Sequence, residues 1–195
     1  MPRKKRELLD EGIYHVFNRG NDRQDLFRED EDFNVFLRGL LEAKTAYETD
    51  IYHYCLMNNH FHLLIKIKKA ADLPHLMHRL LLNYTRYFKR KYNFLGHLFQ
   101  SRFKSPRIPD DSYYLQCGRY IERNPVKAGI VSDPASYKWS SAAYYALGQQ
   151  NPLVTPNIHY KDLAKTPEER MVKYQQFLAL DEPYGVLIQR ELALA

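Results

Sequence analysis

The spacing of apolar residues along the first third of the chain predicts a strand, a helix and a hairpin. Residues 12–20 combine β-branched and aromatic side chains between two glycines, which is typical of a strand. Over residues 30–46 apolar side chains recur at i, i+3, i+4 and i+7 after an acidic start, the pattern of a one-faced helix. Two apolar runs, 51–57 and 61–68, flank Asn58-Asn59, and asparagine tolerates the positive φ of a tight turn. These two runs are therefore predicted to form a β-hairpin.

The middle of the chain predicts a helix, a strand and a further helix. Residues 72–91 carry an apolar stripe at helical spacing, with Asp72 as the expected N-cap. Residues 98–108 alternate apolar with polar or cationic side chains and predict a fourth strand. Residues 111–123 return to helical spacing and stop at Asn124-Pro125, because the residue before a proline disfavours the helical region. The predicted fold class is α+β, a ferredoxin-like βαββαβ antiparallel sheet with helices on one face and a further C-terminal helix that carries candidate chemistry.

The last quarter of the chain predicts a helical tail. Residues 137–147 are expected to form a short helix around Trp139, and the sequence Thr-Pro-Glu-Glu opens a helix over 166–180 as a capping box with proline at the first position. A stretch rich in Gln, Asn and Pro at 148–156 marks the expected boundary. The predicted division is a domain over residues 1–147 and a helical extension over residues 148–195.

Length and composition exclude several classes of protein. The chain has 195 residues, of which 45% are hydrophobic and 27% charged, so it is expected to bury a core of its own. No apolar run reaches the roughly 18 residues of a membrane span, and no apolar segment follows the basic start, so neither membrane insertion nor secretion is expected. Cys55 and Cys117 form no CxxC pair, which argues against a disulfide framework or a thiolate zinc site. A cytoplasmic protein is the expectation.

Charge and aromatic content favour a nucleic acid partner. Lys and Arg number 29 against 23 Asp and Glu, which gives a net charge of +6 and a pI near 9.2. The 16 tyrosines and 10 phenylalanines can stack on unpaired bases while the cations neutralise phosphates, which together suit a single strand. Such a protein would be nucleoid-associated. A basic protein with a tyrosine-rich core explains the same composition.

His60-Phe61-His62 is the first candidate for chemistry. In a strand, residues i and i+2 point to the same face, so the two imidazoles are expected to project side by side while Phe61 enters the core. Two such nitrogens can serve as ligands of a divalent ion. By itself the pair can equally be surface or hydrogen-bonded histidine.

Tyr120 and Asn124 can supply a nucleophile and a further metal ligand beside the two histidines. They are four residues apart and share a face of the predicted helix. The amide could complete a metal site, and the phenol could attack a phosphodiester held by that metal. The structural alternatives are a tyrosine at the edge of the core and an asparagine that ends a helix.

Together these residues resemble the single-tyrosine HUH transposases (IS200-like), whose name stands for histidine, hydrophobic residue, histidine. The match runs through segments 14–20, 56–65 and 120–129, in the same order and spacing, and covers residues 8–147. Within the family the chain is most similar to the REP-associated tyrosine transposases, in which the tyrosine helix continues into an Asn-Pro-Val-Lys segment. Insertion-sequence relatives usually carry glutamine where Asn124 stands.

The resemblance implies an activity and a set of site residues. His60 and His62 would bind Mg²⁺ or Mn²⁺, Asn124 would be the third ligand and Tyr120 the nucleophile. Relatives of this kind cut single-stranded DNA near imperfect hairpins, keep the 5′-phosphate on tyrosine, release a free 3′-hydroxyl and can rejoin strands. The implied fold is the ferredoxin-like one predicted from the pattern.

Charge suggests which other residues contact the DNA. A basic arm begins the chain, and further cations follow the first and fourth predicted strands. The candidate DNA-binding residues are Asn18, Arg19, Arg102, Lys104, Lys4, Lys5 and Arg6.

Two other functions stay open from the sequence. A ferredoxin-like sheet with aromatic and basic faces can be a non-catalytic module that binds single-stranded DNA or RNA by stacking. A metal-dependent nuclease that activates water would have no need of Tyr120. The chain could also act as a monomer or as a homodimer with exchanged tyrosine helices, since both arrangements occur among the proteins it resembles.

Overall fold

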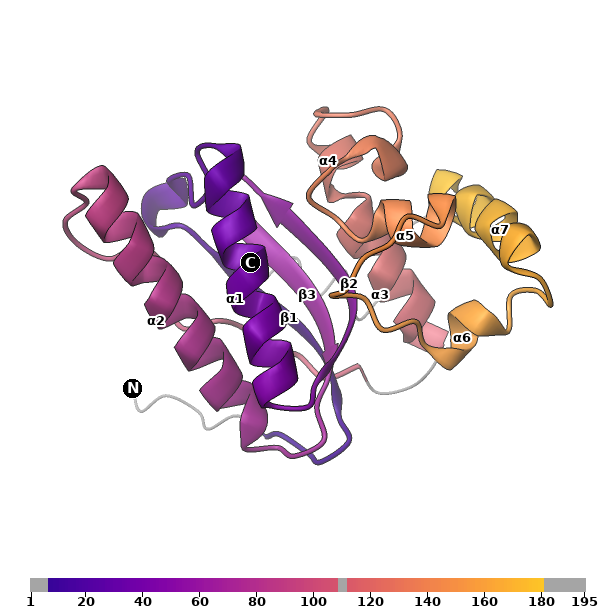
Figure 1. Cartoon of the computed structure of the whole chain (residues 1–195), viewed down its shortest axis with the longest axis horizontal. Coiled ribbons are helices and arrows are strands. Elements are labelled where there is room, and N and C mark those ends of the chain that lie inside the picture. Colours follow the sequence, from indigo (N-terminus) through magenta and orange to yellow (C-terminus); the bar gives the residue numbers. More distant parts are fainter. Residues whose placement is uncertain (1–6, 109–111, 181–195) are drawn as a thin grey trace.

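A three-stranded antiparallel sheet forms the centre of the molecule. The computed structural model describes residues 7–108 and 112–180. The strands are β1 (Ile13–Arg19), β2 (Asp50–Met57) and β3 (His60–Lys66), in the order β1-β3-β2 (Figure 1). The predicted strand at 12–20 and the predicted hairpin are thereby confirmed. β3 is the central strand, so its ends are fixed by hydrogen bonds on both sides.

Two long helices cover one face of this sheet. They are α1 (Asp30–Ala46) and α2 (Asp72–Tyr92), which lie side by side in Figure 1. The ring of Phe36 in α1 packs 5.1 Å from the ring of Phe61 in β3 and 5.2 Å from that of Tyr84 in α2, between ring centroids. All three rings are buried, so this face provides the main core that holds β3 in place. The helix over 72–91 is confirmed, but Ala71 and not Asp72 occupies its N-cap position, and no side chain caps it.

The helix α3 (Ser112–Glu122) lies on the opposite face, against β2 and β3. Gly118 allows a close approach there, because a Cβ at this position would lie 2.6 Å from Nε2 of His53 in β2. The side chain of Glu122 at the end of α3 accepts a hydrogen bond from His53, with 2.9 Å between Oε1 and Nδ1. The helix is thus tied down at its C-terminal end, next to Tyr120 and Asn124.

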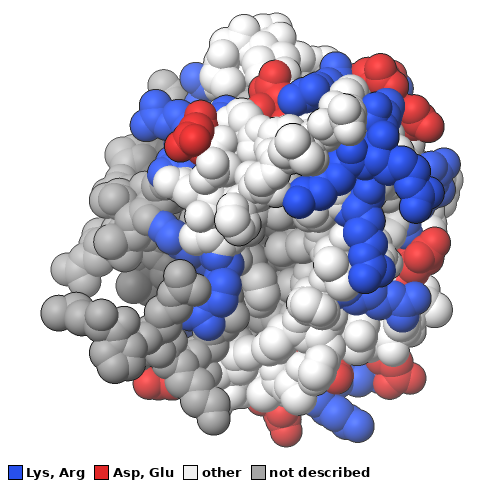
Figure 2. Space-filling model, turned by 90° about the vertical axis from the view of Figure 1, so that its left-hand side faces the viewer, with Lys and Arg blue, Asp and Glu red and all other residues white. Residues whose placement is uncertain are grey.

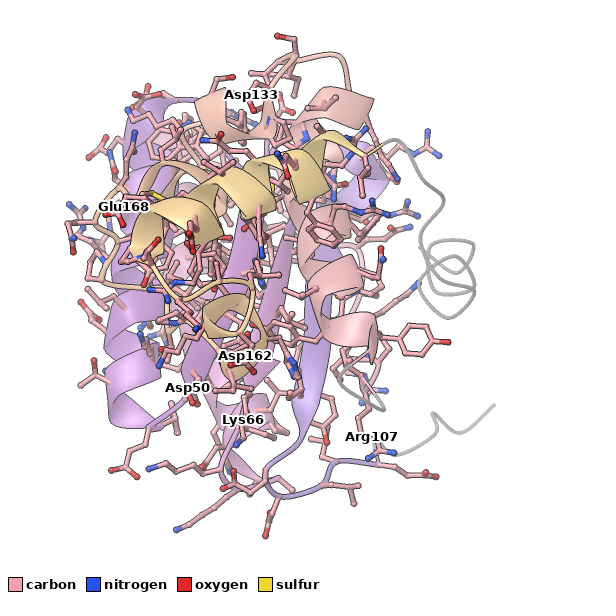
Figure 3. The ribbon with its side chains drawn as sticks, turned by 90° about the vertical axis from the view of Figure 1, so that its right-hand side faces the viewer. Asp50, Lys66, Arg107, Asp133, Asp162 and Glu168 are labelled. Atoms are coloured by element: carbon pink, nitrogen blue, oxygen red, sulfur yellow. The ribbon has the colours of Figure 1, made fainter. Side chains whose placement is uncertain are left out.

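Short helices and the tail build a layer over α3. These elements are α4 (Asn124–Lys127), η2 (Pro134–Ser136), α5 (Ala142–Leu147), α6 (Ile158–Lys161) and α7 (Pro167–Ala179). The short helix η1 (Asn21–Arg23) is not part of this layer and follows the end of β1. Figure 3 shows α7 nearest the viewer, across α3, with Asp50 and Lys66 at the lower end of the sheet and Asp133 at the upper end. The expected helix over 166–180 is confirmed, and the Thr166 hydroxyl accepts from the Glu169 amide as its cap.

The fold class is confirmed as α+β with an antiparallel sheet, but two element predictions are wrong. Residues 98–108 form no continuous strand, and their backbone pairs with β1 through isolated bridges, Tyr14 with Arg107 and Phe17 with Lys104. Pro106 has no amide hydrogen to give to a ladder, and the chain bends at 100–102.

The helix predicted over 137–147 begins only at Ala142. The carbonyl of Trp139 accepts from the Leu56 amide and the Ser141 amide donates to the Tyr54 carbonyl, so this stretch pairs with β2 instead. None of the helices within 7–108 and 112–180 has the length and apolar character needed to cross a bilayer.

Candidate active site

A cleft of about 620 Å³ opens at the end of the sheet where β3 begins. It collects the four residues predicted to carry chemistry, His60 and His62 from β3, Tyr120 from α3 and Asn124 from α4. The other residues that line it are Phe17, Asn18, Arg19, Arg23, Asn59, Gln100, Ser101 and Lys104.

Strand register explains why the two histidines face this cleft together. In the β1–β3 pairing Phe17 lies opposite His62 and Arg19 opposite His60. Residues directly opposite each other point to the same face of a sheet, as do residues two apart in one strand. The same rule places His15, two residues before Phe17, on the face that carries α3. The alternation predicted for His60, Phe61 and His62 is therefore confirmed, with Phe61 in the core on the other side.

Each of the two imidazoles is held at its Nδ1 atom. Nδ1 of His60 lies 2.7 Å from Oδ1 of Asn59, and Nδ1 of His62 lies 2.9 Å from Nε2 of His15. The rings of His60 and His62 meet edge to face, with centroids 5.1 Å apart. With both Nδ1 atoms engaged, Nε2 is the nitrogen through which each ring would bind a metal.

Burial keeps both rings neutral. The pKa of His60 is lowered mainly by burial, against a hydrogen bond with Asn124 that raises it, while the charge of Arg19 lowers it further. The pKa of His62 is lowered strongly, first by burial and then by the neighbouring His15, His60 and Lys127. Because a metal binds the neutral imidazole, these shifts favour the form that can act as a ligand.

Asn124 is oriented by the helix that precedes it. Its Nδ2 donates to the carbonyls of Tyr120, at 2.9 Å, and Ile121, at 3.1 Å. Since both amide hydrogens are directed to the helix end, Oδ1 is the atom available to His60 and to the cleft. The predicted break before Pro125 is present, because α3 ends at Glu122 and α4 begins at Asn124.

Tyr120 lies beside the histidines on the floor of the cleft. Its ring is 4% exposed and meets the ring of His62 edge to face, with 5.6 Å between centroids. Nζ of Lys127, in α4, lies 4.9 Å from the centroid of the same ring. Tyr120 lies near the end of α3, and Asn124 and Lys127 lie in α4, which begins two residues after α3 ends. This unit of two helices places a phenol and an amide at the cleft and an ammonium group against the phenol ring.

The donor set fits a divalent cation that accepts nitrogen and oxygen ligands. Within residues 7–108 and 112–180 no group of three or more His, Cys, Asp or Glu side chains could hold a metal ion. The third protein ligand would therefore be the amide oxygen of Asn124, beside the two imidazole nitrogens. Two imidazole nitrogens and one amide oxygen would suit a divalent cation that takes mixed nitrogen and oxygen ligands, a class that includes Mn²⁺.

The candidate DNA-binding residues separate into two groups. Asn18, Arg19 and Lys104 line the cleft, and Asn18 also supports its wall through a bond from Nδ2 to the Ser101 carbonyl. The Arg19 guanidinium donates to the Gln100 side chain. Arg102 is not at the cleft and instead lines a second cavity of about 390 Å³ against α2. Lys4, Lys5 and Arg6 lie outside the described residues.

Basic side chains also gather on the outside of the molecule. Figure 2 shows Lys and Arg as a band along the right-hand edge, on the side of α1 and α2, next to a hollowed surface with few charges. The exposed cations of α2 are Arg79, Arg86, Lys89 and Arg90. Lys91 on the same helix is ion-paired with Glu29, Glu31 and Asp32.

Two residues at the site were not assigned a role from the sequence. His15 contacts His62 from β1, and Lys127 contacts the ring of Tyr120. The spacing of Lys127, seven residues after Tyr120, could have indicated one helical face. His15 could be found only through the register of β1 with β3, which the sequence does not state.

The comparisons with known proteins identify the family and the fold. The family model of IS200-like transposases matches residues 9–124. The chain is similar in structure to a REP-associated tyrosine transposase bound to a REP hairpin, with a TM-score of 0.65 and 17% identity over 81% of this chain and 93% of that one.

A second solved structure, of a candidate transposase from Deinococcus radiodurans R1, gives a TM-score of 0.43 and 17% identity over 62% of this chain and 96% of that one, too low to carry an argument. No curated protein matches the chain.

Fold and family together define a DNA-processing enzyme of the transposase class. More particularly, the chain belongs to the family of IS200-like transposases, because the family model covers more than half of it. The resemblance drawn from the HUH, tyrosine and Asn-Pro segments is thus confirmed at the level of the family, and the fold is that of the REP-associated tyrosine transposase.

Proposed function

We propose that the protein is a metal-dependent endonuclease and strand transferase that cuts single-stranded DNA through a covalent 5′-phosphotyrosine. The observation that carries the proposal is the meeting of His60, His62, Tyr120 and Asn124 in one cleft, from elements far apart in the sequence. A module that only binds DNA has no use for a helix-borne phenol beside two neutral imidazoles and an oriented amide.

The proposed reaction is a phosphoryl transfer to Tyr120. The phenolic oxygen attacks the phosphorus and loses its proton, the bond from phosphorus to the 3′-oxygen breaks, and that oxygen leaves and takes up a proton. Attack by a 3′-hydroxyl on the phosphotyrosine reverses these steps, so strands can be rejoined without a nucleotide cofactor. Mg²⁺ or Mn²⁺ held by His60, His62 and Asn124 would polarise a non-bridging phosphate oxygen.

The protein's own residues then have separate tasks. The helix unit of α3 and α4 holds the Tyr120 ring against His62, which fixes the direction of the phenol. Lys127, 4.9 Å from the ring centroid, favours negative charge at the phenol and at the phosphate. Arg19 and Lys104 add positive charge at the cleft wall, where the strand on either side of the cut would lie.

We infer that the substrate is DNA with a REP-type hairpin. The similar transposase of known structure is bound to a REP hairpin. The cleft is open at one end of the sheet, and the cations of α2 offer a second basic surface to a stem. Because Tyr120 reaches the histidines of its own sheet, a single chain can supply the complete site.

The test is capture of the covalent adduct. Labelled single strands carrying REP-type hairpins are incubated with the protein and Mn²⁺, and the products are separated on a denaturing gel. Wild-type protein is expected to give a protein-linked DNA band, Tyr120→Phe none, and Tyr113→Phe, a control on the same helix outside the cleft, the wild-type amount. Hairpin binding by Tyr120→Phe is expected to stay within about twofold, because only the hydroxyl is lost.

Two results would contradict the proposal in different ways. Tight hairpin binding without any adduct by the wild-type protein would favour a non-catalytic binding module. Metal-dependent cutting that survives in Tyr120→Phe would favour a nuclease that activates water.

A further inference from the structure

His15 is a buried histidine that contacts the site without lining the cleft. It is 3% exposed, and its Nε2 lies 2.9 Å from Nδ1 of His62. Its ring lies 4.9 Å from that of Phe17 and 5.8 Å from that of Tyr120, which it meets edge to face. One imidazole thus touches both a candidate metal ligand and the candidate nucleophile.

Only one arrangement of the shared hydrogen is compatible with metal binding by His62. If Nδ1 of His62 donates to His15, Nε2 of His62 keeps its lone pair for the cleft. If His15 donates instead, the neutral His62 ring carries its hydrogen on Nε2, and that nitrogen is unable to act as a ligand. The hydrogen bond between the two rings and metal binding are therefore coupled.

His60 shows the same arrangement with a different partner. In the metal-binding form of this ring, Nδ1 donates to the Oδ1 atom of Asn59, which can only accept, and Nε2 keeps its lone pair for the metal. An acceptor behind Nδ1 is the usual way in which proteins orient histidine ligands. For His60 the acceptor comes from the hairpin turn, and for His62 it comes from the neighbouring strand.

We propose that His15 is a positioning residue that accepts the Nδ1 hydrogen of His62 and so fixes the tautomer and the ring angle with which His62 meets the metal. The inference rests on the proposed metal-dependent function. It gives a reason for a buried polar residue in the middle of β1. It also makes the position of the Tyr120 ring depend on the same imidazole, through their edge contact.

The test separates the hydrogen bond from the packing. His15→Phe keeps a ring of similar size but has no nitrogen, whereas His15→Gln offers an amide oxygen that can accept from His62. Mn²⁺ binding to the full chain is measured by calorimetry in the absence of DNA. We expect His15→Phe to weaken Mn²⁺ binding by about 10- to 100-fold, the usual effect of losing an outer-shell partner, and His15→Gln to recover part of the loss.

A second measurement uses the wild-type protein alone, so it does not depend on whether a variant folds. Nitrogen NMR of the metal-free protein at neutral pH is expected to show His62 protonated at Nδ1 and not at Nε2. The opposite assignment, or wild-type Mn²⁺ affinity in His15→Phe, would overturn the role of His15 while leaving the metal site in place. Failure of the wild-type protein to bind Mn²⁺ would instead overturn the metal-dependent function itself.

Discussion

Two histidine clusters lie under α3, and they differ in partners and in access. In the cleft, His60 and His62 are held by the neutral side chains of Asn59 and His15 and face an open space of about 620 Å³. At the other cluster, His53 is fully buried and bonded to the carboxylate of Glu122. The cleft cluster leaves coordinating atoms for a ligand, whereas the Glu122 cluster satisfies its charge within the protein.

The Glu122 cluster ties the tyrosine helix to three other elements. Its carboxylate accepts from His53 in β2, from Ser141 at the start of α5, at 2.5 Å, and from Tyr174 in α7, at 2.7 Å. Ser, His and Glu are also residue types of hydrolase triads, but here Ser141 donates to Glu122 and not to His53. With the serine, histidine and carboxylate side chains buried, no substrate reaches them. Residue type alone thus does not distinguish a histidine that can bind a ligand from a structural histidine.

Glu122→Gln should produce the largest effect, and it should act on stability. The amide keeps one acceptor oxygen but puts an NH2 donor in place of the other, among three side chains that donate to the carboxylate, and breaking such a buried network costs about 3 kcal/mol. Urea unfolding at pH 7 measures the loss. Glu168→Gln, an exposed carboxylate in the first turn of α7, serves as the control and should stay within about 0.5 kcal/mol of the wild type. A Glu122→Gln protein as stable as the control would show that the cluster contributes little to folding.

His60→Ala should instead affect metal binding strongly and stability little. Losing one of three ligands is expected to weaken Mn²⁺ binding by more than about 100-fold, beyond the effect of outer partners. The half-buried ring contributes little to the core, so the free energy of unfolding should change by less than about 1 kcal/mol. Calorimetry with Mn²⁺ and urea unfolding give the two values, with exposed His78→Ala as the control. A variant that binds Mn²⁺ normally but unfolds readily would make His60 a structural residue.

Acid should destabilise the protein through the cleft histidines. Burial lowers the pKa of His15 from 6.5 to about 3, and the pKa values of His60 and His62 are lowered as well. Below pH 6.5 these histidines are protonated in the unfolded chain but stay neutral in the folded chain. Their contribution to the free energy of unfolding is therefore fully present above this pH and is lost as the pH falls. One such histidine contributes a slope of up to about 1.4 kcal/mol per pH unit.

The contribution of His15 to this slope can be isolated. Urea unfolding at pH 7, 6 and 5 should show a steeper loss for the wild type than for His15→Phe, which has no proton to gain at this position. Parallel curves for the two proteins would show that His15 is protonated as easily in the folded chain as in the unfolded one.

Lys127→Gln should have the smallest effect, confined to the chemical step. An exposed cation over an aromatic ring contributes about 1 kcal/mol, and its loss corresponds to about a fivefold slower single-turnover cleavage. Lys138→Gln is a matched control, because Nζ of Lys138 also lies over a ring, 4.3 Å from the centroid of Trp139, but that ring, unlike the ring of Tyr120, does not line the cleft. Equal cleavage rates for both variants would remove Lys127 from the proposed mechanism.

The sequence predicts those parts of the fold that depend on local pattern. The helix at Asp30–Ala46 and the hairpin around Asn58-Asn59 follow from apolar spacing and turn chemistry, and both are present. The strand predicted at 98–108 is not, because alternation alone does not reveal the bends and the proline that interrupt pairing. The helix predicted from residue 137 starts later, because the backbone around Trp139 is used by β2.

For the site, the sequence predicts the residues of a motif but not their supports. The fixed offsets within His60-Phe61-His62 and from Tyr120 to Asn124 determine a shared face once the element is known. The contact of His15 with His62 depends on the register between two strands, and the Glu122 cluster depends on how α3, α5 and α7 pack on β2. Such contacts between distant segments have no signature in a single sequence.

The absent side chain of Gly118 has a consequence for Tyr120, the proposed nucleophile, two residues further on. A methyl group at this position would lie 2.6 Å from the His53 ring, so the gap between α3 and β2 is too narrow for even the smallest side chain. Gly118 therefore allows α3 to pack directly on β2. The separation between α3 and the sheet in turn determines the distance from Tyr120 to the histidines on β3. The distance from Tyr120, the proposed nucleophile, to the proposed metal ligands thus depends on a residue outside the cleft.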